Sequence, residues 1–265
     1  MCQEKPKKSS DLKRKVNYFL SSPKLGRPEV KNLLDQLQGL GGVGIFGGML
    51  RDLSLLGNEG FDSDIDLVID TDKEDELDTL LRPYRPVQNK FGGYRLKLSR
   101  WPVDIWLLKS TWAFKKGYVE DDTFADLCKT TFFDWDGIVY KVGDGTILTV
   151  DGYFDHINEK LLDINLENNP NPMGNIVKAF RYREKYGAGF SNRLAKYIYE
   201  NLEDFDPDRI SSYENKSHDR PVLSSNIISQ IFEELCIHQE KYPLLPFVGA
   251  GVQSSLWTAK DDQGS

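Results

Sequence analysis

The chain has 265 residues, of which 39% are hydrophobic and 28% are charged, and its formal net charge is −7. These proportions are typical of a globular protein with room for one large or two small domains. The negative charge argues against a protein that coats duplex nucleic acid, because such proteins carry an excess of basic residues. No apolar run approaches about 18 residues, and residues 1–15 lack an apolar signal segment, so we expect no membrane span, no secretory signal and a cytoplasmic location.

The cysteines and histidines show no pattern of a metal or nucleophile site. They are scattered along the chain as Cys2, Cys128, Cys236, His156, His218 and His238. This spacing matches neither a zinc site nor a disulfide framework. A reducing compartment is the simplest interpretation of such cysteine usage.

The N-terminal segment is polar and basic. Residues 1–16 contain six lysine and arginine residues, which favours a frayed arm, with a weak electrostatic contact to a nucleic acid or a partner as the alternative. We therefore assign residues 1–27 to a basic flexible arm. Residues 28–38 carry apolar side chains at helical spacing behind Pro28 and predict a helix.

A glycine pair, Gly47 and Gly48, follows a short apolar run at residues 43–46. The apolar period after the glycines predicts a short helix that stops at Gly57 and Asn58. Glycine lets the backbone approach a phosphate closely, and the start of a helix offers N–H groups that lack intrahelical partners. The pattern therefore favours a phosphate-binding turn.

An alternating run follows the helix. Asp62, Asp64 and Asp66 share one parity, and Ile65, Leu67 and Ile69 share the other. The run predicts a strand with one apolar face and one carboxylate face. Carboxylates on adjacent same-face positions, about 7 Å apart at Cα, repel each other unless a cation or water separates them. Two hard divalent ions there can activate an attacking oxygen and stabilise a leaving one. The alternative is an edge strand with a solvated acidic face.

These two motifs carry a family resemblance. GGMLRD at residues 47–52, followed by SDIDLVID at residues 63–70, resembles the head-domain signature of the DNA polymerase β-like nucleotidyltransferase superfamily. The nearest resemblance is to the class II tRNA nucleotidyltransferase and bacterial poly(A) polymerase branch. It implies an α+β head with a mixed sheet and flanking helices. It also implies that Asp64 and Asp66 hold two Mg²⁺ or Mn²⁺ ions and that Gly47, Gly48 and Arg51 cradle a triphosphate.

A lone carboxylate, Asp104, lies in the next predicted sheet segment. Residues 71–81 suit a helix, and residues 94–98 and 103–108 predict two paired strands. A carboxylate within an apolar strand needs a partner. One interpretation is a salt bridge to Lys97 or Arg100. The other is a third catalytic metal ligand, which members of the superfamily commonly supply in this order.

The centre of the chain leads to a predicted domain boundary. Residues 110–128 contain two helical patches, residues 129–142 predict a hairpin with its turn at 136–137, and residues 153–162 predict an amphipathic helix. A turn cluster at residues 168–172 marks the boundary. We therefore expect a catalytic head over residues 28–168, a helical neck and C-terminal domain over 169–256, and a flexible tail over 257–265.

A basic helix is predicted at residues 174–189. Residues 171–197 hold six basic residues and one acidic residue, which suits a solvated face or, with interleaved aromatic residues, a triphosphate or a single strand. The segment resembles the class II neck helix, where Arg181 matches and Lys178 is a conservative change, so both are candidate nucleotide-binding residues. Asn175 departs from that pattern, and the family's preceding Glu-Asp-Pro is missing. In class II enzymes, the Asp of that Glu-Asp-Pro and the Arg at the position of Asn175 read the base edge. Their absence here argues against CCA addition.

The remaining segment predicts few elements. Residues 204–221 are polar with Asp-Pro and Pro turns, and residues 225–239 predict a helix.

The motifs predict a metal-dependent, template-independent nucleotidyltransferase. It would move a nucleoside monophosphate from ATP or another (d)NTP to a hydroxyl acceptor and release pyrophosphate. The acceptor stays open, but the compact size and acidic net charge slightly favour synthesis of short oligonucleotides, as in bacterial antiphage systems. The alternatives are a tRNA or other RNA 3′ end and a protein or small molecule, with Ser265 as one protein hydroxyl. A protein partner is compatible with each. The non-enzyme alternative is an inactive nucleotide-binding module, against which the two repelling carboxylates argue.

Overall fold

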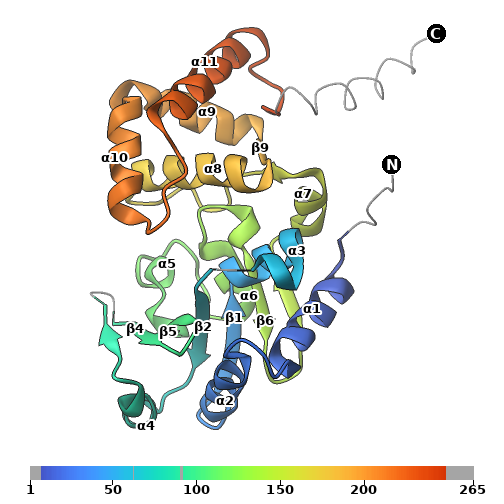
Figure 1. Cartoon of the computed structure of the whole chain (residues 1–265), viewed down its shortest axis with the longest axis vertical. Helices are drawn as coiled ribbons and strands as arrows, with labels where there is room; N and C mark the ends of the chain where they lie inside the picture. Colours follow the sequence, from blue (N-terminus) through green and yellow to red (C-terminus); the bar gives the residue numbers. More distant parts are fainter. Residues whose placement is uncertain (1–6, 62, 90–91, 249–265) are drawn as a thin grey trace, which may run out of the picture. The chain divides into compact units, whose positions relative to one another are not determined.

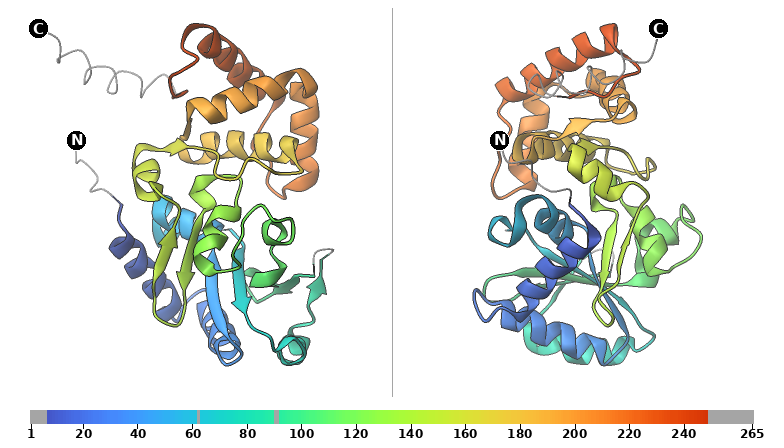
Figure 2. Two further views of the ribbon diagram at one scale, coloured as in Figure 1. Left: turned by 180° about the vertical axis from the view of Figure 1, so that it is seen from behind. Right: turned by 90° about the vertical axis from the view of Figure 1, so that its right-hand side faces the viewer.

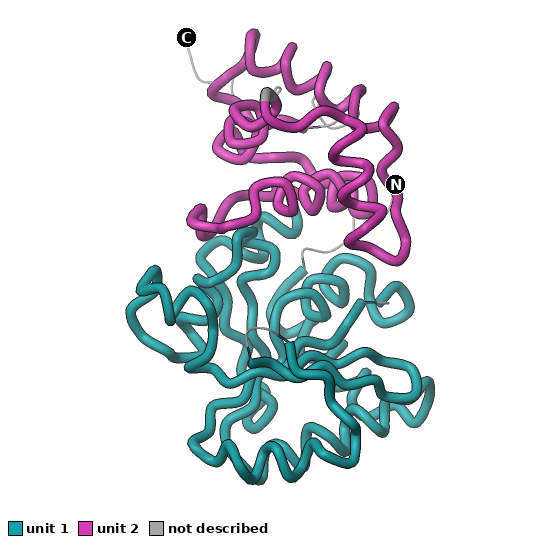
Figure 3. Tube along the Cα trace, turned by 90° about the vertical axis from the view of Figure 1, so that its left-hand side faces the viewer, with its two compact units in different colours: residues 1–158 teal, residues 159–265 magenta. Residues whose placement is uncertain are grey.

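The chain folds into two units (Figures 1 and 3). The structure, a computed structural model, describes residues 7–61, 63–89 and 92–248. The first unit spans residues 1–158, and the second spans residues 159–265. This division lies before the turn cluster at residues 168–172, which is the boundary that the sequence predicts. No helix in the described ranges is both long enough and apolar enough to cross a membrane.

A mixed sheet forms the centre of the first unit (Figure 1). Its strands are β1 (Gly42–Phe46), β2 (Ile65–Asp70), β3 (Val87–Gln88), β4 (Tyr94–Lys97), β5 (Pro102–Leu107), β6 (Ile138–Lys141) and β7 (Ile147–Thr149). They lie side by side in the order β3-β4-β5-β2-β1-β6-β7. Strands β2 and β5 run parallel, and the other neighbouring strands run antiparallel. The sheet confirms the predicted α+β class and the predicted pairing of residues 94–98 with 103–108.

Helices cover both faces of this sheet (Figure 2). They are α1 (Ser9–Ser21), α2 (Arg27–Gln38), α3 (Gly48–Gly60), α4 (Glu74–Leu81), α5 (Trp112–Lys115), α6 (Phe124–Leu127) and α7 (Tyr153–Glu159). Short 3₁₀ turns lie at Arg82–Tyr84, Leu108–Ser110, Cys128–Thr130 and Asp134–Asp136. Helices α1 to α3 lie on one face, and α5 and α6 lie on the other.

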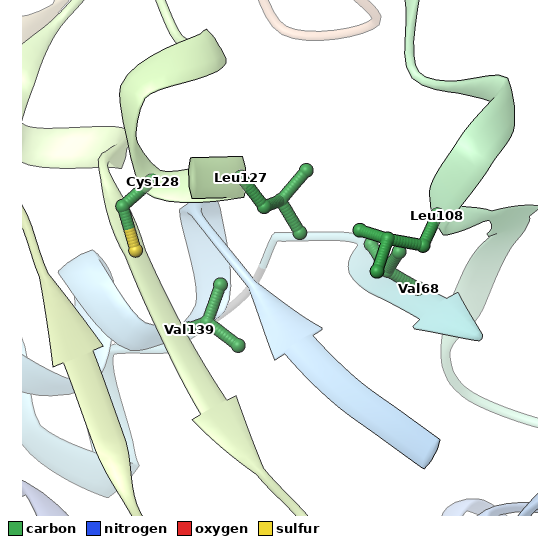
Figure 4. Close-up of a cluster of buried hydrophobic side chains, with 5 residues drawn as sticks. All are labelled: Val68, Leu108, Leu127, Cys128 and Val139. Atoms are coloured by element: carbon green, nitrogen blue, oxygen red, sulfur yellow. The ribbon is translucent and has the colours of Figure 1, made fainter. Parts of the chain in front are cut away.

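The alternation in β2 explains its two packed faces. Ile65, Leu67 and Ile69 are fully buried on one face. Val68 points to the other face, where it joins a buried cluster with Leu108, Leu127, Cys128 and Val139 (Figure 4). Burial in this cluster raises the pKa of the Cys128 thiol to about 12. A thiol with a raised pKa stays protonated at neutral pH, so Cys128 packs as an apolar residue.

The expectation of a flexible basic arm is wrong for the part of residues 1–27 that forms α1. The helix buries Leu12, Val16 and Phe19, which follow each other at helical spacing. Lys15 donates from Nζ to the carbonyl oxygen of Leu53 at 2.8 Å, which ties α1 to α3. The high lysine content hid this apolar stripe, because the charges occupy the solvent-facing positions of the same helix. Residues 1–6 lie outside the described residues.

The hairpin predicted over residues 129–142 forms later in the chain. The Asp-Gly pair at 136–137 ends a 3₁₀ turn instead of joining two strands. The observed hairpin pairs β6 with β7, and its turn lies over residues 142–146. Asp144 Oδ1 accepts the backbone N–H of Thr146 at 2.8 Å, and Gly145 has a φ of 66°. Asp and Gly are common in such turns, so the sequence offers two candidate turns and tertiary packing selects between them.

The second unit is mainly helical, as predicted. Its elements are β8 (Leu161–Leu162), α8 (Pro172–Tyr186), β9 (Gly189–Phe190), α9 (Asn192–Asn201), a 3₁₀ turn (Leu202–Asp204), α10 (Pro207–Ser217) and α11 (Ser225–Lys241). Helices α8 and α11 confirm the helices predicted over 174–189 and 225–239. Helix α10 lies where we expected turns, because Asp206-Pro207 begins a helix there. The Asp206 carboxylate accepts the N–H of Arg209 at 2.7 Å, and proline suits the first helical position.

Candidate active site

The glycine pair lies at the junction of β1 and α3. Gly47 has φ 62° and ψ −114°, a conformation that side chains with a Cβ rarely adopt, and its N–H donates to Ile138 O at 3.0 Å. Gly48 is the first residue of α3. The first N–H groups of a helix lack intrahelical acceptors and carry a partial positive charge. The strand-to-helix turn at Gly47 and Gly48 is therefore present, and phosphate binding there stays a prediction.

Ser63 lies close to the start of α3 and was not among the predicted site residues. A Cβ on Gly48 would lie 3.6 Å from Arg51 Nη2 and 3.8 Å from Ser63 Oγ. The Ser63 hydroxyl is buried and has no hydrogen-bond partner within the described part of the chain. The start of α3, the Arg51 guanidinium and the Ser63 hydroxyl therefore lie around the position of that Cβ. Ser63 begins the SDIDLVID run, but its closeness to Gly48 depends on tertiary packing, which the motif alone does not predict.

Arg51 forms a buried ion pair beside the glycine turn. Its Nε and Nη2 donate to Asp52 Oδ1 at 2.9 and 2.7 Å, and its Nη1 donates to Asp136 Oδ1 at 2.5 Å. The three side chains are 8%, 0% and 7% exposed. The guanidinium hydrogens point at these carboxylates, so the structure gives Arg51 an internal role. A direct contact of Arg51 with phosphate stays a prediction.

The three predicted catalytic carboxylates come together on one face of the sheet. Asp66 in β2 and Asp104 in β5 are Cα partners in the parallel pairing. Parallel neighbours lie about 4.8 Å apart. Asp64 precedes Asp66 by two residues and lies just before β2. Residues that share parity and register project from the same face, so Asp64, Asp66 and Asp104 converge.

Arg95 in β4 lies across this carboxylate cluster, which we define as Asp64, Asp66 and Asp104. It is the antiparallel Cα partner of Asp104. Its Nε donates to Asp104 Oδ1 at 2.8 Å, and its Nη2 donates to Asp104 Oδ2 at 2.6 Å and to Asp64 Oδ2 at 3.1 Å. Asp104 therefore has an ion-pair partner on the strand where we expected one, at Arg95 and not at Lys97 or Arg100.

The pKa of Arg95 is raised by all three carboxylates of the cluster. The hydrogen bonds to Asp104 raise it above its ordinary value, and the negative charges of Asp104, Asp64 and Asp66 raise it further, while partial burial opposes them. One guanidinium therefore feels the charge of all three carboxylates. A concentration of negative charge of this kind attracts any cation of suitable size.

The three carboxylates offer oxygen donors, and Arg95 is the cation that contacts two of them. Carboxylate oxygens are the ligands that Mg²⁺ and Mn²⁺ prefer. Within the described ranges, no group of three or more His, Cys, Asp or Glu side chains is arranged to hold a metal ion. The guanidinium lies between Asp64 and Asp104 instead, and metal binding by these carboxylates stays a prediction.

The two predicted nucleotide-binding residues of α8 make their observed contacts within the second unit. Arg181 Nη1 donates to the Glu214 carboxylate and, at 3.0 Å, to Arg220 O. Glu214 is fully buried and also accepts the N–H of Leu223 at 2.8 Å. Lys178 Nζ lies 5.6 Å from the centre of the Tyr182 ring. Arg181 therefore neutralises a buried carboxylate, and a nucleotide contact of Lys178 or Arg181 stays a prediction.

The basic excess over residues 171–197 is largely neutralised by acidic partners. The ion pairs are Arg181–Glu214, Arg183–Glu234 at 2.7 Å, Arg193–Glu167 at 3.2 Å and Lys196–Glu200 at 3.6 Å. All four partners lie outside the window in which we counted charge. Arg181 and Arg183 are only 23% and 14% exposed, so they form partly buried ion pairs instead of a solvated face.

Comparison with solved structures shows the fold. No protein-family model and no curated protein matches the chain. The complex of a CCA-adding enzyme with CTP matches with a TM-score of 0.62 at 17% identity, over 88% of this chain and 56% of that one. The Thermotoga maritima CCA-adding enzyme complexed with tRNA matches with a TM-score of 0.60 at 16% identity, over 88% of this chain and 56% of that one. A tRNA nucleotidyltransferase complexed with a primer tRNA and an incoming ATP analog matches with a TM-score of 0.53 at 18% identity, over 79% of this chain and 61% of that one.

These similarities extend over a part of the matched enzymes. The chain spans little more than half the length of the two CCA-adding enzymes. It shares with them the nucleotidyltransferase-like head fold and a helical part that follows it.

Proposed function

We propose that the first unit is the catalytic head of a metal-dependent, template-independent nucleotidyltransferase. The reaction joins the α-phosphorus of a nucleoside triphosphate to an acceptor hydroxyl oxygen, breaks the bond to the β-phosphate bridge, and releases pyrophosphate. The acceptor proton is lost to the medium or to a carboxylate of the site.

The convergence of three carboxylates beside a glycine-started helix supports this proposal most. Asp66 and Asp104 are register partners, and Asp64 shares their face. Strand β1 leads into the turn at Gly47 and Gly48 and pairs directly with β2, so the turn and the carboxylates belong to neighbouring strands. A phosphate site next to a cation site is what transfer from a triphosphate requires.

Each group of this chain has a separate task in the proposed reaction. The carboxylate cluster would hold the divalent ions, and the N–H groups at the start of α3 and the Ser63 hydroxyl would donate to the triphosphate. Divalent ions bound there supply Lewis-acid stabilisation for the attacking and leaving oxygens. The buried Arg51 holds Asp52 and Asp136 beside the helix start, and the three groups together carry a formal charge of −1.

The acceptor we favour first is a nucleic acid 3′ hydroxyl. The matched solved structures are complexes with CTP, tRNA and an ATP analog, which supports an RNA end as a candidate. Asn175 is buried in α8 where the class II neck helix has arginine, and this difference argues against CCA addition. Synthesis of short oligonucleotides, including a role in antiphage defence, and transfer to a protein hydroxyl are the alternatives that the product distinguishes.

A product assay tests the proposal. The full chain is incubated with Mg²⁺ and each NTP and dNTP, with and without a single-stranded RNA that has a free 3′ hydroxyl, and products are identified by mass spectrometry. In the reaction that contains RNA, we expect pyrophosphate together with an extended RNA. In the reaction without RNA, we expect no nucleic acid product. Oligomers formed without RNA would indicate oligonucleotide synthesis, and an adduct on the chain would indicate a protein acceptor. Absence of pyrophosphate with every triphosphate contradicts the proposal.

Replacing Gly48 with alanine is expected to separate nucleotide binding from folding. The new Cβ would make ordinary contacts with Arg51 and Ser63, so the melting temperature should stay the same or rise. The same methyl group fills the point at which a phosphate would approach, so KM for the triphosphate should rise about tenfold, or ~1.4 kcal/mol. Steady-state kinetics and thermal unfolding measure the two effects.

Gly47→Ala is the matched comparison. Its Cβ would have space but would hold alanine at a φ of 62°, which costs about 1–3 kcal/mol of stability. An unchanged KM in a stable Gly48→Ala variant would place the triphosphate away from this turn.

A further inference from the structure

Arg95 occupies the position between two carboxylates that the proposed metal would bind. It makes three hydrogen bonds, two to Asp104 and one to Asp64. Bidentate guanidinium–carboxylate pairs are among the stronger ion pairs because both N–H groups align with both oxygens. A metal ion that needs these oxygens must therefore replace the guanidinium.

The charge balance of the site favours such a replacement. Three carboxylates and one guanidinium leave a formal charge of −2 at the cluster. Arg95 alone therefore does not neutralise Asp64, Asp66 and Asp104, although it lowers their attraction for a second cation. A divalent ion carries twice the charge and is the better match once Arg95 has left.

The position of Arg95 lets it leave without disturbing the core. Its side chain is 57% exposed, and its partners Asp64 and Asp104 are 45% and 24% exposed. The apolar neighbour Leu96 anchors β4 on the opposite face. The guanidinium can therefore swing into solvent while the backbone of β4 keeps its pairing with β5.

We propose that Arg95 is a resident counter-ion that holds Asp64 and Asp104 together in the metal-free protein and competes with the divalent cation for them. This inference rests on the proposed metal-dependent function. Arg95 is a positioning residue in this scheme: it keeps the carboxylates convergent before the metal arrives, and it sets the metal concentration at which the site fills.

Lys97 offers a matched control on the same strand. It lies two residues after Arg95, shares its strand face and is exposed, and its Cα partner is Pro102 instead of a carboxylate. Arg95→Gln and Lys97→Gln both remove one positive charge from this face of β4. Only the first removes hydrogen bonds to the carboxylate cluster.

A Mn²⁺ titration of the full chain tests the inference. Binding is followed by electron paramagnetic resonance, without nucleotide, for the wild type and for Arg95→Gln, Arg95→Lys and Lys97→Gln. We expect the Mn²⁺ dissociation constant to fall about tenfold in Arg95→Gln, by a smaller factor in Arg95→Lys, and to stay within about twofold of wild type in Lys97→Gln. Thermal unfolding should show that all variants are folded, since both side chains are exposed.

Asp66→Asn identifies the site that is titrated. If Asp66→Asn abolishes Mn²⁺ binding but Arg95→Gln binds as the wild type does, or more weakly, the counter-ion inference is overturned and the metal site stands. If Lys97→Gln tightens binding as much as Arg95→Gln, a general charge effect replaces the inference. If Asp66→Asn binds Mn²⁺ as the wild type does, the proposed metal site itself is wrong, and the inference falls with it.

Discussion

Asp66→Asn is expected to lower the rate of nucleotidyl transfer about a thousand-fold while the protein stays folded. The amide has the shape of the carboxylate but not its charge. The loss of one metal ligand would remove about 4 kcal/mol of transition-state stabilisation. Asp66 lies in β2 between β1 and β5, where it pairs with Phe46 and Asp104. The measurement is kcat with saturating Mg²⁺ and triphosphate.

The control for this prediction lies on the same strand. Asp70 shares the parity of Asp66 and ends β2, but it is exposed and its Cα partner is Gly42. Asp70→Asn should keep wild-type kcat. An Asp66→Asn variant with more than a tenth of the wild-type rate would show that the carboxylate cluster does not carry the chemistry.

Arg51→Met is expected to lower the free energy of unfolding by about 3–5 kcal/mol. The methionine side chain fills a similar volume, but Asp52 and Asp136 would keep buried charges without the guanidinium between them. Removing one member of a buried ion pair costs this much because the remaining charge is left uncompensated. Equilibrium unfolding in urea, monitored by circular dichroism, measures the loss.

An exposed arginine provides the comparison. Arg14 pairs with Asp11 at 3.0 Å, but its side chain is 77% exposed, so Arg14→Gln should change stability by less than about 0.5 kcal/mol. Adding Asp52→Asn and Asp136→Asn to Arg51→Met should restore part of the lost stability, since it removes the two unpaired charges. If Arg51→Met is as stable as the wild type and only KM for the triphosphate rises, Arg51 contacts phosphate as the sequence motif implies.

The local pattern predicts most of the head from β1 to β2. Alternation in residues 65–69 predicts the strand and its two faces. The Gly57 turn signal predicts the end of the helix, but the structure has a kink there, with φ 74° at Gly57, and α3 continues to Gly60. These features depend on neighbouring residues, so the sequence contains the information for them. The convergence of Asp64 with Asp66 follows from the same period of two.

The partner of Asp104 shows where local pattern stops. Lys97 and Arg95 share one face of β4, and a register shift of two residues exchanges them without moving any side chain to the other face. Alternation excludes a shift of one residue but permits a shift of two. The structure pairs Arg95 with Asp104 and Lys97 with Pro102, a register that alternation alone does not select.

Partners that are distant in the sequence explain the remaining differences. Arg51 pairs with Asp136, which lies 85 residues away, and the basic residues of α8 and α9 pair with acids outside the window in which they were counted. A motif or a charge count has no access to such partners. The motif therefore predicts which residues lie near the site but not which atoms they contact.

The short outer strands of the sheet have a consequence for association between chains. Strand β3 has two residues and β7 has three, so each edge of the seven-stranded sheet offers few open N–H and C=O groups. Long open edges recruit strands from other molecules and lead to aggregation, and short edges give an incoming strand little to pair with. The interior strands that carry Asp66 and Asp104 are thereby shielded from intermolecular pairing, which favours a dispersed protein at the high concentrations that a spectroscopic titration needs.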